Sequence, residues 1–251
     1  MSVYEIPGIV SWIEFNAAMK AAFERCCQIA GEYVVYAIRT MVASSGRRVE
    51  IVGHSQGGMV PRWALRFWPD TRALVDDVIG LSASNHGTLD ANVVCVLTCA
   101  PAIWQQRSNA AFIAALNSIQ ETIPGISYTD IYTNTDEVVV PNFGPAGSSS
   151  LQGGGGAITN VAIQQVCPLD LTEHIGIAIY DITAFHIARD ALTHPGPADP
   201  SRVPRSICLQ PLMPGVNPVA FPLNFASTLG TVRRRSPRTH TLRPSRRSPA
   251  T

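Results

Sequence analysis

A single pentapeptide, Gly53-His54-Ser55-Gln56-Gly57, constrains the fold of this chain more than any other segment. A short apolar run, Val49 to Val52, precedes it, and a helix-compatible stretch from Met59 to Trp68 follows it. The G-x-S-x-G pattern between a strand and a helix is typical of a nucleophile elbow, in which a strained serine exposes its hydroxyl. We expect the two flanking glycines to avoid Cβ clashes in the turn. The alternative is a glycine-rich loop that only closes a βα unit.

Two neighbours of the serine are candidate site residues on the same argument. The backbone N–H of Gln56 would point into the space beside the serine hydroxyl, where it could stabilise an oxyanion. His54 stands directly before the serine, where we expect it to shape the pocket.

The length of 251 residues suits one α/β domain, with or without a tail, and 46% hydrophobic residues are ample for its core. No run of about 18 uninterrupted apolar residues is present, so the sequence predicts no transmembrane span. The remaining segments alternate between the periodicities of strands and helices, which favours a parallel sheet. We expect further strands at 78–82, 128–133 and 158–166, and helices at 11–30, 32–44, 91–116 and 175–192. Gly31 is expected to interrupt the first helical stretch.

The net charge of +1 hides an uneven distribution. Residues 231–251 contain seven arginines and no acidic residue, whereas the other residues hold 12 Lys and Arg against 18 Asp and Glu, a net charge of −6. This tail also contains three prolines and few apolar residues, so we expect it to be disordered. A solvated extension is preferred to binding of nucleic acid or anionic membrane.

An acid and a base are expected downstream of the serine, because a hydroxyl needs an imidazole to take its proton and a carboxylate to orient that imidazole. Asp136 fits the acid, since it follows the strand predicted to end at Thr133. We expect Glu137 to be a surface acid that points away, and Asp130 lies within the strand. His174 fits the base, because it follows the next predicted strand and precedes a helix.

Other histidines and the cysteines suit these roles less well. His86 follows a strand and could line the site, but it precedes every candidate acid. No cysteine or histidine spacing resembles a zinc site. Cys95 and Cys99 lie one helical turn apart in an apolar segment, so we expect buried thiols. Cys167 and Cys208 flank proline-containing loops and could form a disulfide in an oxidising compartment.

These motifs together resemble the fungal lipase family typified by Candida antarctica lipase B. The matching stretches are 32–38, the elbow at 53–58, 63–75, 86–88, Pro-Ala-Ile-Trp-Gln-Gln at 101–106, 132–141 and 167–176. The acid lies 81 residues after the serine and the histidine 38 residues after the acid, in the chain order of an α/β-hydrolase. The resemblance covers about residues 32–218.

The resemblance implies an α/β-hydrolase that cleaves acylglycerols or related lipid esters, acts without a cofactor and is secreted. It implies Ser55, Asp136 and His174 as the catalytic triad and Gln56 as an oxyanion donor. Gln106 would line the acyl pocket, and His54, where the named lipase has a bulky aromatic residue, would affect the alcohol side. It also implies a disulfide between Cys167 and Cys208. The substrate would be a lipid ester, met at a lipid–water interface, and no nucleic-acid partner is expected.

The chain departs from the family pattern upstream of Tyr33. The family has further strands there and a loop that supplies a second oxyanion donor, but residues 1–31 are too few for them and contain no Gly-Thr-Gly-like loop. Residues 1–7 also show no signal peptide. We therefore expect a sheet lacking its N-terminal strands, an atypical helical segment at 1–31, a lipase domain at 32–230 and a tail at 231–251. The alternative function is a catalytically impaired lipase remnant that binds lipid or a partner.

Overall fold

The computed structural model describes residues 26–96 and 99–222. Its helices and strands, in chain order, are α2 (Cys27–Ser45), β1 (Val49–His54), α3 (Gln56–Phe67), β2 (Val75–Leu81), α4 (Leu89–Val94), α5 (Pro101–Gln105), α6 (Ala111–Asn117), β3 (Ser127–Tyr132), β4 (Ala157–Ala162), α7 (Ile163–Val166), α8 (Gly176–Ile179) and α9 (Ile182–Thr193). Short 3-10 helices span Pro69–Leu74, Gly144–Ala146, Pro200–Arg202 and Arg205–Leu209. The predicted tail and most of the predicted helix at 11–30 lie outside the described residues.

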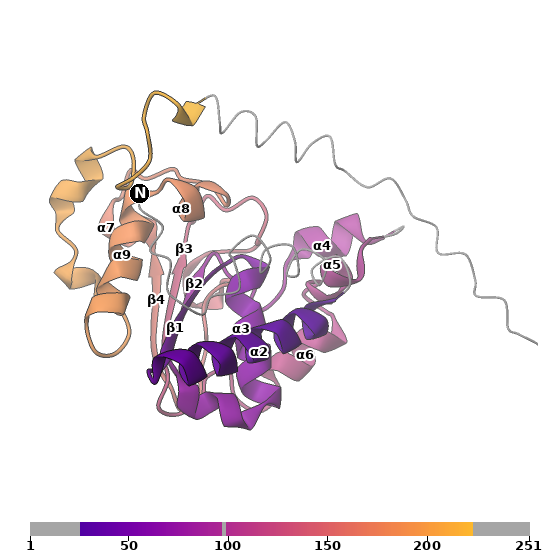
Figure 1. The fold of residues 1–251 in the computed structure, drawn as a ribbon. Helices are drawn as coiled ribbons and strands as arrows, with labels where there is room; N and C mark the ends of the chain where they lie inside the picture. Colours follow the sequence, from indigo (N-terminus) through magenta and orange to yellow (C-terminus); the bar gives the residue numbers. More distant parts are fainter. Residues whose placement is uncertain (1–25, 97–98, 223–251) are drawn as a thin grey trace, which may run out of the picture. The chain divides into compact units, whose positions relative to one another are not determined.

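The four strands form one sheet in the order β1-β2-β3-β4, and every neighbouring pair is parallel (Figure 1). The predicted parallel α/β sheet is therefore confirmed. Because parallel strands end at the same edge of the sheet, the segments after β1, β2 and β3 all emerge together. Ser55, Ser82 and Thr133 begin these segments. Within the described part of the chain β1 is the first strand, and it lies at an edge of the sheet.

Helices cover the sheet from both faces. Successive side chains of a strand point to opposite faces, so the partners of Val78 and Ile79 of β2 show which helices pack on each face of the sheet. Val78 is buried with Ile38 of α2 and Leu65 of α3, whereas Ile79 is buried with Ile187 of α9. Helices α2 and α3 accordingly contact β1, and α9 contacts β2 and β3 (Figure 1). This layered arrangement leaves the carboxyl edge of the strands for the loops that carry the candidate site.

The predicted helix break at Gly31 is wrong, because α2 runs through it without interruption and ends at Ser45. Gly31 is buried, and a Cβ there would lie 2.8 Å from Cδ1 of the Trp63 side chain. The glycine therefore allows α2 to approach α3 closely. A tertiary contact, rather than a change of direction, explains a residue that by local preference weakens a helix.

Three other predicted elements are divided in the structure. The helix expected at 91–116 is three helices, with Pro101 at the start of α5. The strand expected at 158–166 changes into α7 after Ala162, whose N–H donates to Oε1 of Gln165 (3.2 Å). The helix expected at 175–192 is α8 followed by α9, and the side chain of Asp181 caps α9 by accepting from the N–H of Ala184.

Two disulfides link described residues. One joins Cys167 and Cys208, the pairing that the resemblance implies. The other joins Cys95 and Cys99, so the expectation of two free thiols there is wrong. Helix α4 ends at Val94, and the chain beyond it brings the two Cα atoms to 5.0 Å, within the range of disulfides. Cys26 and Cys27 are free thiols.

The chain divides into two units, Met1–Met213 and Pro214–Thr251. The first contains the sheet, all the helices named above and the candidate site. In the described residues of the second, the side chain of Asn217 accepts hydrogen bonds from the N–H groups of Val219 and Ala220. Within residues 26–96 and 99–222, no helix is long and apolar enough to cross a bilayer.

Candidate active site

Ser55 lies between β1 and α3 in a strained backbone conformation. Its φ of 55° and ψ of −125° fall in a region that residues with a Cβ rarely adopt. The strand beside it stabilises this turn, because the N–H of Ser55 donates to the carbonyl of Leu81 (2.8 Å). The carbonyl of Ser55 in turn accepts from the N–H of Gly58 (3.0 Å). The segment thus has the strand–turn–helix geometry that the G-x-S-x-G pattern predicts.

The two glycines of the motif play different parts. A Cβ at Gly53 would lie 2.0 Å from the carbonyl oxygen of Gly57, so only glycine fits there. A Cβ at Gly57 would meet nothing within 4 Å, and the expected clash at this position is wrong. The close approach on the helical side is made by Gly58, whose added Cβ would lie 2.7 Å from Cβ of Ala83.

Replacing Gly53 with alanine should therefore destabilise the fold by about 3 kcal/mol, since the clash is with backbone that cannot move independently. The matched variant Gly57→Ala should change the free energy of unfolding by less than about 1 kcal/mol. Urea denaturation followed by the fluorescence of the buried Trp63 measures both. Equal effects of the two substitutions would contradict this account of the turn.

Asp136 lies in the loop after β3 and is buried in a set of donors. Oδ1 accepts from the N–H groups of Val138 (3.0 Å) and Val139 (2.8 Å), and Oδ2 accepts from the side chain of Asn142 (3.2 Å). Both carboxylate oxygens lie 3.0 Å from Nδ1 of His174. Burial raises the pKa of Asp136, but the hydrogen bond and charge of His174 and the N–H of Val139 outweigh it, so the pKa falls below its ordinary value.

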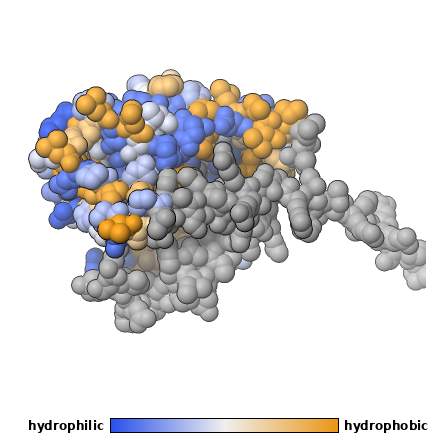
Figure 2. Space-filling view, turned by 90° about the horizontal axis from the view of Figure 1, so that it is seen from above, coloured by the Kyte–Doolittle hydropathy of each residue, from blue (hydrophilic) through white to orange (hydrophobic). Residues whose placement is uncertain are grey.

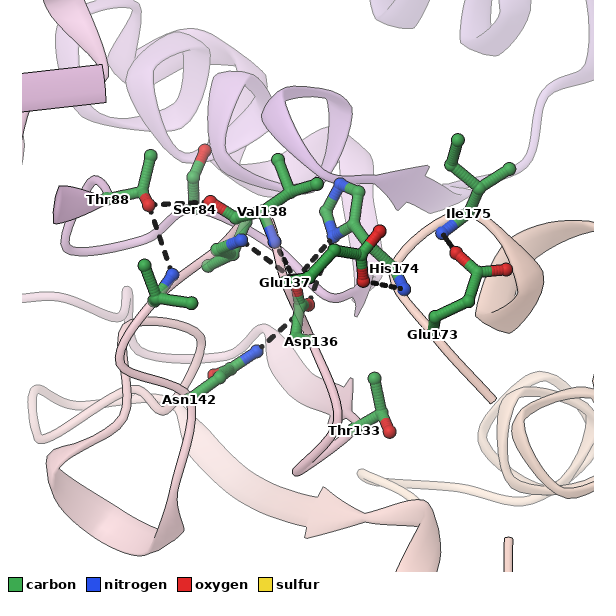
Figure 3. Close-up of polar contacts among 12 residues, drawn as sticks. Ser84, Thr88, Thr133, Asp136, Glu137, Val138, Asn142, Glu173, His174 and Ile175 are labelled. Atoms are coloured by element: carbon green, nitrogen blue, oxygen red, sulfur yellow. Dashed lines mark hydrogen bonds and ion pairs between the residues drawn. The ribbon is translucent and has the colours of Figure 1, made fainter. Parts of the chain in front are cut away.

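His174 is buried beside this carboxylate and is held through three groups, of which Figure 3 shows Asp136 and Glu137. Its ring nitrogen Nδ1 donates to Asp136, and its backbone N–H donates to Oε2 of Glu137 (3.1 Å). Its carbonyl oxygen lies 2.7 Å from Nε2 of His54. Because an ionised carboxylate only accepts hydrogen bonds, Asp136 fixes the proton of neutral His174 on Nδ1 and leaves Nε2 free to accept one.

The structure brings the acid and base candidates together and sets them against the elbow. The rings of His54 and His174 are 4.6 Å apart between centroids. Among the described residues, no hydrogen-bond partner is recorded for the Ser55 hydroxyl. The elbow and the loop at residues 172–174 that carries His174 (the base loop) therefore meet through His54, the residue that precedes the serine.

The other predicted site residues lie near the elbow with their side chains engaged. Gln56 is the first residue of α3, so its backbone N–H has no partner within the helix, while its side chain donates to Sγ of Cys27 (2.9 Å). Gln106 is buried, where its side chain accepts from the Ser84 hydroxyl (2.9 Å) and donates to the carbonyl of Ala102 (3.2 Å).

The rejected candidates occupy other positions. Asp130 is buried inside β3, where Oδ1 accepts from Asn85 (2.7 Å) and burial raises its pKa to about 7. His86 contacts Oε1 of Glu121 (2.9 Å). Glu137 corrects the sequence analysis, because its exposed carboxylate contacts the backbone of His174 instead of pointing away. Sequence reasoning also missed Asn142, although an amide six residues after the acid is a signal that could have been weighed.

A known protein family matches the part of the chain that carries this site. A family model described as Lipase (class 2) matches residues 10–174, which include Ser55, Asp136 and His174. The chain belongs to the class 2 lipase family. Lipase B of Pseudozyma antarctica is 34% identical to it over 170 residues, 66% of this chain and 48% of that protein.

A solved structure is similar to this chain in fold as well as in sequence. The crystal structure of Aspergillus fumigatus lipase B is similar, with a TM-score of 0.72 and 35% identity over 77% of this chain and 48% of that chain. The expected α/β-hydrolase fold and the resemblance to the lipase B family are thus confirmed. The chain spans about half the length of the class 2 lipases that it matches.

Proposed function

We propose that this chain is a serine carboxylic-ester hydrolase of lipase type, which forms an acyl-enzyme on Ser55. The observation that carries the proposal is the buried contact between Nδ1 of His174 and Asp136, 3.0 Å long, in a loop that also contacts the elbow. The strained backbone of Ser55 and membership of the class 2 lipase family support it. The relatives named above are themselves called lipases.

The proposed reaction has two stages. The Ser55 hydroxyl oxygen attacks the ester carbonyl carbon while Nε2 of His174 takes the hydroxyl proton. The bond to the alcohol breaks, and His174 gives the proton to the departing oxygen, which leaves Ser55 acylated. Water then attacks the acyl group, His174 transfers the proton of that water to Oγ, and the fatty acid departs. Asp136 stabilises the positive imidazole at both stages.

The negative charge that develops on the carbonyl oxygen needs donors, and we assign one of them to the backbone N–H of Gln56. This N–H begins α3, where the partial positive charge of the helix terminus adds to the hydrogen bond. His54 would border the alcohol side of the substrate, and Gln106 the acyl side. The reaction as written needs only these groups and water, and we propose no cofactor.

Lipid esters are the substrate class that the surroundings favour. Helix α4 begins beside the loop after β3 that carries Asp136 (the acid loop), since the hydroxyl of Thr88 donates to the carbonyl of Val138 (2.6 Å). This helix and the turn after it expose Val93 (72%), Val94 (63%) and Val96 (76%). Figure 2 shows apolar residues gathered in patches on the face seen from above. We propose that such surface meets a lipid–water interface. The two disulfides fit an oxidising, extracellular compartment.

The deciding experiment combines hydrolysis with covalent labelling. The purified chain should hydrolyse p-nitrophenyl butyrate, and a p-nitrophenyl alkylphosphonate should stop hydrolysis at one equivalent per chain. Mass spectrometry should find the phosphonyl group on the peptide that contains Ser55. Labelling of another residue would contradict the assignment. A folded chain that neither hydrolyses the ester nor reacts, but binds phospholipid vesicles, would support the impaired lipase remnant instead.

A further inference from the structure

The backbone of His174 is held from both sides. Its N–H donates to the carboxylate of Glu137 (3.1 Å), and its carbonyl oxygen lies 2.7 Å from Nε2 of His54. Figure 3 shows the Glu137 contact next to the hydrogen bond between Asp136 and the ring. The proposed reaction uses the ring of His174 alone, so these two backbone contacts have no part in it so far.

The contact with His54 fixes the state of that side chain. A carbonyl oxygen only accepts hydrogen bonds, so Nε2 of His54 carries the proton and Nδ1 of the neutral ring does not. Burial first, and then the charge that His174 can carry, lower the pKa of His54 to about 4. His54 therefore stays neutral near pH 7 and adds no positive charge beside the imidazole of His174, where such a charge would oppose its protonation.

The acid loop and the base loop form one hydrogen-bonded block. The hydroxyls of Thr133 and Thr135 both donate to the carbonyl of Thr172, at 2.7 and 2.8 Å. Together with the contacts of Asp136 and Glu137 to His174, they join residues 133–137 to residues 172–174. These two segments are therefore joined by hydrogen bonds from both side chains and backbone.

The elbow reaches this block through one side chain. Among the hydrogen bonds recorded for the described residues, the one from His54 alone links residues 53–58 to the base loop. His54 directly precedes Ser55, so its backbone and that of the serine are continuous. The His54 ring therefore contacts the base and its loop directly, while its backbone continues into the serine.

We propose that His54 and Glu137 are positioning residues, which clamp the backbone of His174 so that its ring faces Ser55. The role rests on the proposed function, because it concerns the same serine and base. Displacing a catalytic group by about 1 Å can cost about 10²-fold in rate. Loss of the His54 contact should therefore lower kcat.

Kinetics of matched variants test the clamp. His54→Phe keeps a ring but loses the donor, whereas His54→Gln keeps a donor without the ring. We expect His54→Phe to lower kcat for p-nitrophenyl butyrate about 10- to 100-fold, beyond any change in KM that its place on the alcohol side causes, and His54→Gln to recover most of the loss in kcat. Glu137→Ala should lower kcat about 10-fold, and Glu137→Gln, which keeps an accepting oxygen, should recover it.

Controls separate positioning from folding. His186→Phe on α9 and Glu32→Ala on α2 make the same chemical changes away from the site and should leave kcat unchanged. Melting temperatures identify any variant that is less folded. In that case the conservative variant at the same position, His54→Gln or Glu137→Gln, is compared with the wild-type chain. An unchanged kcat in folded His54→Phe, in a chain whose activity is lost in Ser55→Ala, would overturn the clamp while the proposed function stands.

Nitrogen NMR of the histidine rings supplies a readout that needs no activity. In the wild-type chain we expect the proton of His54 on Nε2, and we expect His54→Phe, but not His186→Phe, to shift the ring signals of His174. If the wild-type chain hydrolyses no ester, the proposed function fails, and the NMR result still decides the contact. A proton on Nδ1 of His54, or unchanged His174 signals in His54→Phe, would overturn the clamp.

Discussion

Ser55→Ala should lower kcat for ester hydrolysis by about 10⁶-fold, the largest effect expected of any substitution in this chain. The hydroxyl is the group that forms the covalent bond, and no neighbouring side chain can replace it. The fold should survive, because alanine has the same Cβ as serine in the strained turn and the hydroxyl has no recorded partner among the described residues. Stopped assays with p-nitrophenyl butyrate and a melting curve measure the two properties.

The matched control is Ser44→Ala near the end of α2, where an exposed hydroxyl donates to the carbonyl of Met41. Its kcat should equal that of the wild-type chain. More than about 1% residual activity in Ser55→Ala, unaffected by the phosphonate reagent, would place catalysis at another residue. The comparison therefore distinguishes a different nucleophile from an unfolded protein.

The elbow could be predicted from sequence because its signal is local. A strand, a G-x-S-x-G turn and a helix lie within twenty residues, and Gly53 is required by a backbone contact inside that segment. Asp136 and His174 could then be assigned as acid and base from chain order and family resemblance. The hydrogen bond between these two residues, 38 apart in sequence, is the long-range contact that the sequence predicted.

The features that sequence reasoning missed depend on tertiary contacts. Gly31 suggested a helix break because its local preference is weak, but its real constraint is Trp63 on another helix. Glu137 suggested a surface acid, and it is exposed, but the loop turns its carboxylate toward the N–H of His174. Cys95 and Cys99 suggested thiols on a continuous helix, whereas α4 ends before them. None of these outcomes is encoded in the periodicity of one segment.

Asp136→Asn should lower kcat by about 10⁴-fold, although the substitution barely changes the size of the side chain. The reason lies in the donors around the carboxylate. Oδ1 accepts from the N–H groups of Val138 and Val139, and these backbone donors cannot reverse their roles. The amide oxygen of the introduced asparagine must therefore occupy the Oδ1 position, and its NH₂ group must occupy the Oδ2 position.

This orientation places a donor against His174. Nδ1 of His174 lies 3.0 Å from both oxygen positions, so a proton on Nδ1 would face the amide oxygen on one side and the NH₂ group on the other. The clash with the NH₂ group is removed when Nδ1 accepts from it and the ring proton moves to Nε2. Nε2 could then no longer take the proton of Ser55. The NH₂ group would also face the amide of Asn142, whose own oxygen is engaged by the N–H of Ser149. Asp76→Asn at the surface, where the carboxylate pairs with Arg48, is the matched control and should keep full activity.

Nitrogen NMR of His174 together with kcat tests this argument directly. We expect the ring proton on Nδ1 in the wild-type chain and on Nε2 in Asp136→Asn, with loss of activity in the same sample. An Asp136→Asn variant with its ring proton still on Nδ1 and a kcat within about tenfold of wild type would show that another acid orients the base. Glu137, which already contacts the backbone of His174, is the carboxylate nearest in sequence for that role.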